Sequence, residues 1–253
     1  MKKQITTAAV LLFVAALSGC GNNTMGAPSS SSASSALKAS SSSKQAEKDD
    51  IVSIMNSLAG QSKSTGEIYV TGDMKVGKKN TLKPGIYDMT VTGGSGNVMG
   101  TRKSVLSGMP INWVAGVSGT DDNDYPSKIR IILLNGDILK MRNISKVRFT
   151  AIPEKVTPTN ELGIGNYVVG RDIKPGTYKL STNMKMDSEF SNLGWSISIY
   201  NDGTDDSTDK QLNPGSPDVA VELKKGEIIT TSFDNTDNGT PTDNAKLTFT
   251  PVN

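Results

Sequence analysis

The sequence predicts an all-β protein with two tandem small modules, each a β-sandwich or barrel. From Gly66 onward, short runs rich in β-branched and aromatic residues alternate with Gly, Pro, Asn and Asp, and no stretch there has a convincing helical period. A Lys-Pro-Gly-x-Tyr motif occurs twice in this region. A second turn signal follows each copy at almost the same distance, which indicates an internal repeat.

Residues 1–19 are expected to form a signal peptide. Lys2 and Lys3 give a short positive segment, and the mostly apolar run from Ile5 to Leu17 is too short to cross the ~30 Å hydrocarbon layer as a stable helix. The next residues, Leu17-Ser18-Gly19-Cys20, resemble the lipobox of bacterial lipoproteins. The resemblance implies that Cys20 becomes the first mature residue, and that its lipid holds the protein on the outer face of the cytoplasmic membrane. An uncleaved membrane helix with an incidental cysteine is the alternative.

Residues 20–48 comprise the lipidated cysteine and a serine-rich linker. Serine runs occupy positions 29–32 and 40–43, and almost no apolar residue is present to join a core. This composition predicts a disordered stalk that lifts the following region off the membrane.

Residues 49–60 are expected to form a short helix. Ile51, Ile54, Met55 and Leu58 have helical spacing, with two aspartates before them and Gly60 after them. The alternative is a frayed continuation of the stalk, because isolated helices of this length are marginal in water.

Residues 66–153 and 163–253 are interpreted as two copies of one module, with 152–160 as the connector. The recurring segments are Val76-Gly77 with Lys83-Pro84-Gly85-Ile86-Tyr87, and Val169-Gly170 with Lys174-Pro175-Gly176-Thr177-Tyr178. Asn135-Gly136 and Lys225-Gly226 then follow, and their glycines lie 51 and 50 residues after the Pro-Gly glycines. Both dipeptides predict β-hairpins, and each Pro-Gly predicts a type II turn that places a tyrosine in the core. Phe149 and Phe249 have matching places in the last strands.

The second copy, Val169-Gly170-Arg171-Asp172-Ile173-Lys174-Pro175-Gly176-Thr177-Tyr178, resembles the VGxDIxPGxY repeat of secreted and lipid-anchored proteins of Gram-positive bacteria. The first copy fits more loosely, because Lys79-Asn80-Thr81-Leu82 replaces Asp-Ile and adds two residues. The resemblance implies a cell-envelope setting and a small β-sandwich, and it supplies no catalytic residue.

The composition excludes several kinds of chemistry. Histidine is absent and Cys20 is the only cysteine, which rules out Ser/His/Asp and Cys/His catalysis, disulfides, and zinc, haem or iron–sulfur sites built on these residues. No cofactor is therefore expected. Without Lys2 and Lys3, basic and acidic residues balance, so the charge gives no reason to expect nucleic acid.

Two kinds of candidate ligand residue remain. Trp113 and Trp195, one in each module, are candidate ligand-binding residues because an exposed indole offers a stacking surface, with core packing as the alternative. Acidic clusters occur at 121–124, 202–209 and 234–238. They are interpreted as solvated turns, with a weak Ca²⁺ site as the alternative, and no metal ligand is assigned.

These features predict a non-enzymatic, lipid-anchored surface protein with a binding or interaction role in the bacterial cell envelope. The expected partners are the membrane, through the lipid on Cys20, and a cell-wall polymer or surface protein. Two alternatives stay open: a cell-wall polymer hydrolase that uses paired carboxylates, and a passive envelope spacer.

Overall fold

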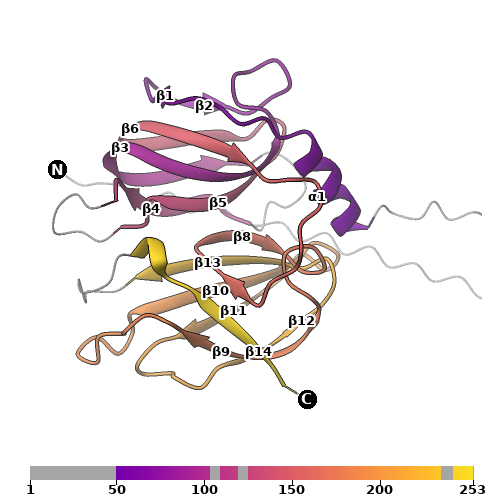
Figure 1. The fold of residues 1–253 in the computed structure, drawn as a ribbon, viewed down its shortest axis with the longest axis vertical. Helices are drawn as coiled ribbons and strands as arrows, with labels where there is room; N and C mark the ends of the chain where they lie inside the picture. Colours follow the sequence, from indigo (N-terminus) through magenta and orange to yellow (C-terminus); the bar gives the residue numbers. More distant parts are fainter. Residues whose placement is uncertain (1–49, 103–108, 119–124, 235–241, 253) are drawn as a thin grey trace, which may run out of the picture. The chain divides into compact units, whose positions relative to one another are not determined.

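The computed structural model describes residues 50–102, 109–118, 125–234 and 242–252 (Figure 1). The expected signal peptide, Cys20 and the serine-rich linker lie outside the described residues. Strands in two sheets dominate the described part, which confirms the expectation of a mostly β protein. No helix in these ranges has the length and apolar character needed to span a membrane.

The elements, in chain order, are α1 (Ile51–Gly60), β1 (Ile68–Tyr69), β2 (Met74–Lys75), β3 (Gly85–Thr101), β4 (Asn112–Gly116), β5 (Lys128–Leu133), β6 (Ile138–Ala151), β7 (Glu161–Leu162), β8 (Gly165–Val168), β9 (Gly176–Thr182), β10 (Gly194–Asn201), β11 (Asp206–Leu212), β12 (Ala220–Leu223), β13 (Ile228–Asp234), the short 3-10 helix η1 (Thr242–Asn244) and β14 (Leu247–Pro251). One sheet has ten strands in the order β1-β6-β3-β5-β8-β13-β10-β11, with β2 also on β6 and β4 also on β3. The other has four strands in the order β12-β9-β14-β7.

The two repeats share one pattern of strand pairing. In the second repeat, β9 pairs with β12 and β14, whereas β10 pairs with β11 and β13. In the first repeat the long β3 takes both parts: its beginning pairs with β5 and the end of β6, and its later half pairs with β4 and the start of β6. The short strands β1 and β2 flank β6 as β7 and β8 flank β14 and β13. The strands of 66–153 and 163–253 therefore pair in the same order, within one shared ten-stranded sheet and one four-stranded sheet.

A glycine-rich bulge allows β3 to serve both roles. The register of β3 against β6 shifts three times between Val91 and Asn97. Gly94 has φ +79°, and a Cβ on it would lie 2.3 Å from the carbonyl oxygen of Asn143. Only glycine fits such a conformation and approach. The bulge bends the strand, so its two halves face different partners.

The expected hairpins at Asn135-Gly136 and Lys225-Gly226 are wrong. β3 lies between β5 and β6 in the ten-stranded sheet, and β12 and β13 belong to different sheets. Both glycines have the left-handed conformation of a tight turn, with φ +92° and +89°. The turns were therefore predicted correctly, but the strands they join pair elsewhere.

Long-range hydrogen bonds explain this outcome. The amide of Gly136 donates to the Val76 carbonyl at 3.0 Å, and the amide of Val76 donates to the Asp137 carbonyl at 2.8 Å. In the second repeat the same two bonds join Val169 to Gly226 and Glu227, at 3.0 and 2.9 Å. Val76 and Val169 thus bind the turns through the carbonyls of Asp137 and Glu227, which a hairpin ladder would use. The two recurring anchors of each repeat are therefore in direct contact.

The predicted type II turns at the Pro-Gly pairs are also absent. Gly85 has no positive φ, and Gly176 has φ +155°, far from the ~80° that such a turn requires. In the first repeat, a Cβ on Gly85 would lie 2.8 Å from the ring of Tyr87. That ring folds back over the motif, and its hydroxyl donates to the Lys83 carbonyl at 3.0 Å. The same Cβ would lie 2.3 Å from Ser62 Oγ, so glycine is needed there to make room for both Ser62 and the tyrosine ring.

The two tyrosines do fill core positions, as expected. Tyr87 packs edge-on against Phe149 with ring centroids 5.8 Å apart, and Tyr178 packs in the same way against Phe249 at 5.9 Å. The hydroxyl of Tyr178 donates to the Lys174 carbonyl, repeating the bond of the first copy. Apolar residues of both repeats belong to one continuous core cluster.

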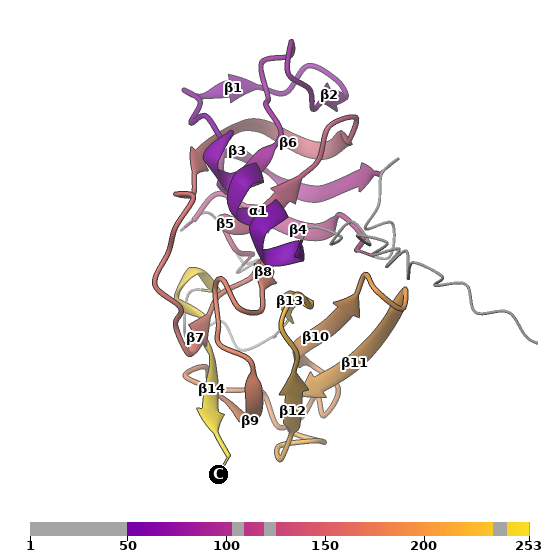
Figure 2. The same ribbon diagram turned by 90° about the vertical axis from the view of Figure 1, so that its right-hand side faces the viewer.

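The helix α1 lies across the place where the repeats meet (Figure 2). Its buried residues are Val52, Met55 and Ala59. They belong to a second apolar cluster that contains Ile132 from the first repeat and Ile228 from the second. The helical pattern of residues 49–60 therefore corresponds to a helix, and its apolar face packs against both copies.

The repeats are joined through β5 and β8, which are neighbours in the middle of the ten-stranded sheet. These strands pair in parallel, with Arg130 opposite Gly165, and the Arg130 amide donates to the Ile164 carbonyl at 3.0 Å. Gly165 has φ +130°, and a Cβ on it would lie 2.0 Å from the Arg130 carbonyl oxygen. The chain from residue 47 onward groups into one compact unit, so both repeats belong to the same body.

Candidate functional site

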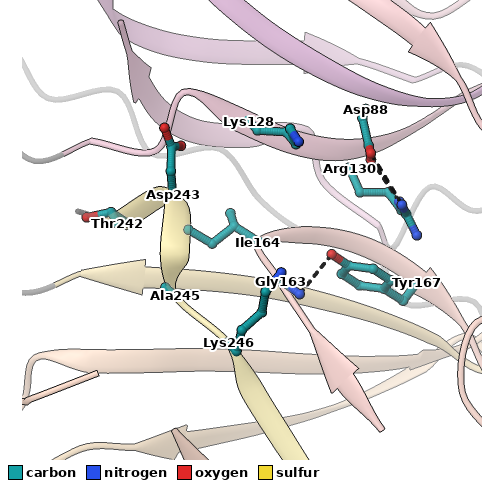
Figure 3. Close-up of a pocket in the computed structure, with 10 residues that line it drawn as sticks. All are labelled: Asp88, Lys128, Arg130, Gly163, Ile164, Tyr167, Thr242, Asp243, Ala245 and Lys246. Carbon is teal, nitrogen blue, oxygen red and sulfur yellow. Dashed lines mark hydrogen bonds and ion pairs between the residues drawn. The ribbon is translucent and has the colours of Figure 1, made fainter. Parts of the chain in front are cut away.

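A polar pocket of about 160 Å³ lies beside the β5–β8 junction (Figure 3). Its first side comes from β3 and β5 of the first repeat, and its second side comes from β7 to β8 and the η1–β14 segment of the second. The lining residues are Asp88, Lys128, Arg130, Gly163, Ile164, Tyr167, Thr242, Asp243, Ala245 and Lys246.

Arg130 is the central side chain of the pocket wall. Its Nε donates to Asp88 Oδ1 at 2.9 Å, and one terminal nitrogen donates to Asp88 Oδ2 at 3.4 Å. The other terminal nitrogen lies 3.7 Å from Asp172 Oδ1, an ion pair without a hydrogen bond. Burial lowers the pKa of Arg130, but the hydrogen bond and charge of Asp88 outweigh this effect and raise the pKa above its usual value. Arg130 is therefore a permanent cation that links both repeats.

Tyr167 lies beneath this guanidinium. The Arg130 Cζ is 5.2 Å from the Tyr167 ring centroid, a cation–π contact between the two repeats. The tyrosine oxygen accepts from the Gly163 amide at 3.0 Å (Figure 3). Burial raises the pKa of Tyr167 to about 12, although the charge of Arg130 opposes the shift. The phenol therefore stays neutral and keeps its proton at physiological pH.

Asp243 is held by the opposite repeat. Its Oδ1 accepts from the Ser127 amide at 2.6 Å, and its Oδ2 accepts from the Ser127 hydroxyl at 2.7 Å. Both carboxylates of the pocket therefore have donors on both oxygens, Asp88 from Arg130 and Asp243 from Ser127.

The two lysines of the pocket differ from its carboxylates. Lys128 begins β5 in the first repeat, and Lys246 directly precedes β14 in the second. Neither ammonium group has a carboxylate partner within the described ranges. With Arg130 they make three cations against two carboxylates, so the pocket has a net positive charge.

A buried ion pair between Arg171 and Asp172 lies next to Arg130 of the pocket wall. Arg171 and Asp172 are each 3% exposed, and Arg171 also donates to the Pro153 carbonyl at 2.7 Å. Asp172 Oδ2 accepts from the Val168 amide at 2.8 Å. Burial raises the pKa of Asp172, and the charge of Arg171 opposes that shift. Asp172 thus closes a turn and lies within ion-pair distance of both Arg171 and Arg130.

Another buried pair lies outside the pocket. Arg102 is 3.4 Å from Asp137 Oδ2, and it donates to the Ile132 carbonyl at 2.7 Å. Burial raises the pKa of Asp137, against the opposing charge of Arg102. The same Oδ2 also accepts from the Leu134 amide at 2.9 Å, so Asp137 has a structural role within the tight turn.

Neither tryptophan offers a surface for a ligand. Trp113 is 4% exposed and its indole N–H donates to the Thr231 carbonyl of the other repeat at 3.1 Å. Trp195 is 1% exposed, donates to Thr182 Oγ1 at 2.8 Å, and packs against Phe233. The stacking role is therefore corrected: both are core residues, and Trp113 is a contact between the repeats.

The acidic clusters do not assemble into a metal site in the part of the chain that is described. No group of three or more acidic, His or Cys side chains there is placed to hold a metal ion. Asp202 and Asp205 lie in the turn between β10 and β11, where Asp205 accepts from the Tyr200 hydroxyl at 2.9 Å. The cluster at 121–124, together with Asp237 and Asn238, lies outside the described residues, as does Cys20.

The sequence alone did not identify the junction residues. Arg130 stands in a mostly apolar strand, and its partners Asp88 and Asp172 lie 42 residues before and after it. The one available signal was a charged residue within an otherwise apolar strand, Ile129 to Leu134.

Comparison with protein-family models, with curated proteins and with solved structures finds no match to this chain. The candidate site therefore rests on its own geometry.

Proposed function

We propose that this is an exported, lipid-anchored protein of the bacterial cell surface with a non-catalytic binding role in the cell envelope. The lipobox-like Leu17-Ser18-Gly19-Cys20 and the serine-rich linker support the location. In this proposal, two copies of one small β-sandwich module act as a single body at the end of a flexible tether.

The junction pocket is the observation that carries the binding role. Its walls come from both repeats, so the site exists only when the two copies are together. Both carboxylates already accept hydrogen bonds on both oxygens, whereas an acid–base pair for glycan hydrolysis needs a carboxylic acid and a carboxylate that face the substrate. The unpaired groups are the donors, which is the arrangement of a binding site.

The binding role is tested by retention on cell-wall fragments. The mature chain, residues 20–253 with Cys20→Ser, should be retained because the pocket and its donors remain intact. A heat-unfolded sample of the same protein is the control. Passage of the folded protein without retardation would refute the binding role and favour a passive spacer.

Anchoring is tested separately in cells. Replacing Cys20 with Ala should release the protein from the membrane fraction, because no lipid can then be attached. Tight membrane association of that variant would contradict lipid anchoring, whatever the outcome on wall fragments.

A further inference from the structure

We propose that the junction pocket binds a phosphate group, held by the ammonium groups of Lys128 and Lys246 and by the hydroxyl of Tyr167. This inference rests on the proposed binding role and names the ligand class for it.

The three donors border the same space. Figure 3 shows Lys128 and Lys246 entering the pocket from opposite sides, one on each repeat. A Cβ placed on Gly163 would lie 3.3 Å from the Tyr167 oxygen and 3.9 Å from Lys246 Nζ, so both groups stand next to Gly163. These contacts place a hydroxyl and an ammonium side by side at the pocket wall.

Tyr167 is a buried donor whose proton is unused. The side chain is 6% exposed, and its oxygen accepts from the Gly163 amide. Within the described ranges its O–H has no acceptor. A buried hydroxyl that lacks an acceptor costs free energy, and a ligand oxygen in the pocket would remove that cost.

The charge of the pocket favours an anion. Asp88 and Asp243 are engaged by Arg130 and Ser127, as described above, so the lysines keep their positive charge for a ligand. Water alone could fill the space, since one water needs ~10–15 Å³. A pocket of about 160 Å³ also has room for a small anionic group with several waters.

The donor set favours phosphate over carboxylate. A planar carboxylate is best recognised by a free arginine fork, but the Nε and one terminal nitrogen of Arg130 already bind Asp88 in this way, and its other terminal nitrogen lies 3.7 Å from Asp172 Oδ1. Lysines act as point charges, and a tetrahedral phosphate accepts from several directions at once. Two lysines on opposite walls and one phenol match that requirement.

The test is titration of the mature chain, residues 20–253 with Cys20→Ser, with inorganic phosphate, followed by amide NMR shifts. Saturable shifts at Gly163 and Lys246 are expected. Lys128→Gln and Lys246→Gln should each weaken binding about tenfold, or about 1.4 kcal/mol, and Tyr167→Phe should weaken it severalfold. Lys140→Gln and Lys155→Gln are the matched controls, because both lysines are exposed, lie outside the pocket and make no ion pair within the described residues. Unchanged denaturation midpoints establish that the variants are folded.

Two further ligands separate the sources of phosphate. Binding to a soluble poly(glycerol phosphate), lost in the Lys128→Gln/Lys246→Gln variant, would assign the pocket to a wall polymer. Binding to phosphatidylcholine vesicles that contain phosphatidylglycerol, lost in the same variant, would assign it to a lipid headgroup. Either result supports the inference.

The inference is overturned if phosphate causes no saturable shift, or if the pocket variants bind as tightly as the wild type. Retention on wall fragments that survives in the Lys128→Gln/Lys246→Gln variant would also refute it, while leaving the envelope-binding role intact. Failure of the wild-type protein to be retained would instead refute that role, and the phosphate titration would still report on the pocket.

Discussion

Replacing Arg130 with Met should destabilise the protein by about 2–4 kcal/mol. Charge-assisted hydrogen bonds such as the one from Arg130 to Asp88 at 2.9 Å contribute about 1.5–3 kcal/mol, and the longer bond at 3.4 Å adds little. The cation–π contact with the buried Tyr167 ring adds about 1 kcal/mol. Two effects limit the loss: Asp88 is 23% exposed and regains water, and Asp172 keeps Arg171 as a partner. Methionine also retains most of the apolar stem.

The assay is equilibrium unfolding in urea, which gives both the midpoint and its slope. The matched control is Arg142→Met, because Arg142 is an exposed arginine on β6 that makes no ion pair with the other described residues. It should change stability by less than about 0.5 kcal/mol. In a double-mutant cycle with Asp88→Asn, the coupling energy should reach about 1–3 kcal/mol. Equal effects of the two arginine variants, or a coupling energy near zero, would refute the central position given to Arg130.

Three further predictions follow from the fold. Met55→Ala should lower the free energy of unfolding by about 2–4 kcal/mol, because Met55 is on the buried face of α1 and 1% exposed. Ile54→Ala, at a site 40% exposed, should lower it much less. Equal losses in urea unfolding would mean that α1 does not cover the junction. Gly136→Ala and Gly226→Ala should each cost about 1–2 kcal/mol, since their φ values of +92° and +89° strain any Cβ; widely different losses would contradict the equivalence of the two turns. In a difference titration by ultraviolet absorbance, wild type minus Tyr167→Phe, the tyrosinate signal should have its midpoint at about 12 rather than near 10. Because this pKa is raised in the folded state, the stability it contributes is present below about pH 10 and is lost as the pH rises toward 12; a midpoint near 10 would show that Tyr167 is open to water.

Local features of the fold were predictable from the sequence. The acidic and apolar spacing before Gly60 corresponds to α1, and the tyrosines after the Pro-Gly pairs fill the core. The positive φ of Gly136 and Gly226 is a property of short turn segments, so it was visible in the dipeptides. The recurrence of the Val-Gly and turn segments also has a structural cause, because Val76 contacts Gly136 and Val169 contacts Gly226.

Pairing partners were not predictable, because they depend on residues far apart in the chain. A tight turn usually joins paired neighbours, but here Val76 supplies the partner for Gly136 from 60 positions upstream. The sequence predicts turns at the Pro-Gly glycines, yet the small size of Gly85 instead makes room for Ser62 and for the ring of Tyr87. In each case a contact outside the local window outweighed the local preference.

The candidate site was not found from the sequence for the same reason. Ser127 and Asp243 are 116 residues apart, and Trp113 and Thr231 are 118 apart, yet both pairs join the repeats. Trp113 and Trp195 are candidates because an indole offers a stacking surface, but a large aromatic side chain also contributes strongly to a core, and both are buried there. The lysines of the pocket carry no motif, and contacts between the repeats, such as the β5–β8 pair and the Ser127–Asp243 hydrogen bonds, bring them together.

The pocket requires that the two repeats unfold and fold as one body, and differential scanning calorimetry of residues 20–253 measures this directly. With a shared core, a β5–β8 pair and α1 across both copies, the account predicts a single transition whose calorimetric enthalpy equals the van't Hoff enthalpy. Two resolved transitions, or a calorimetric enthalpy about twice the van't Hoff value, would mean that the repeats melt independently, and would contradict the account.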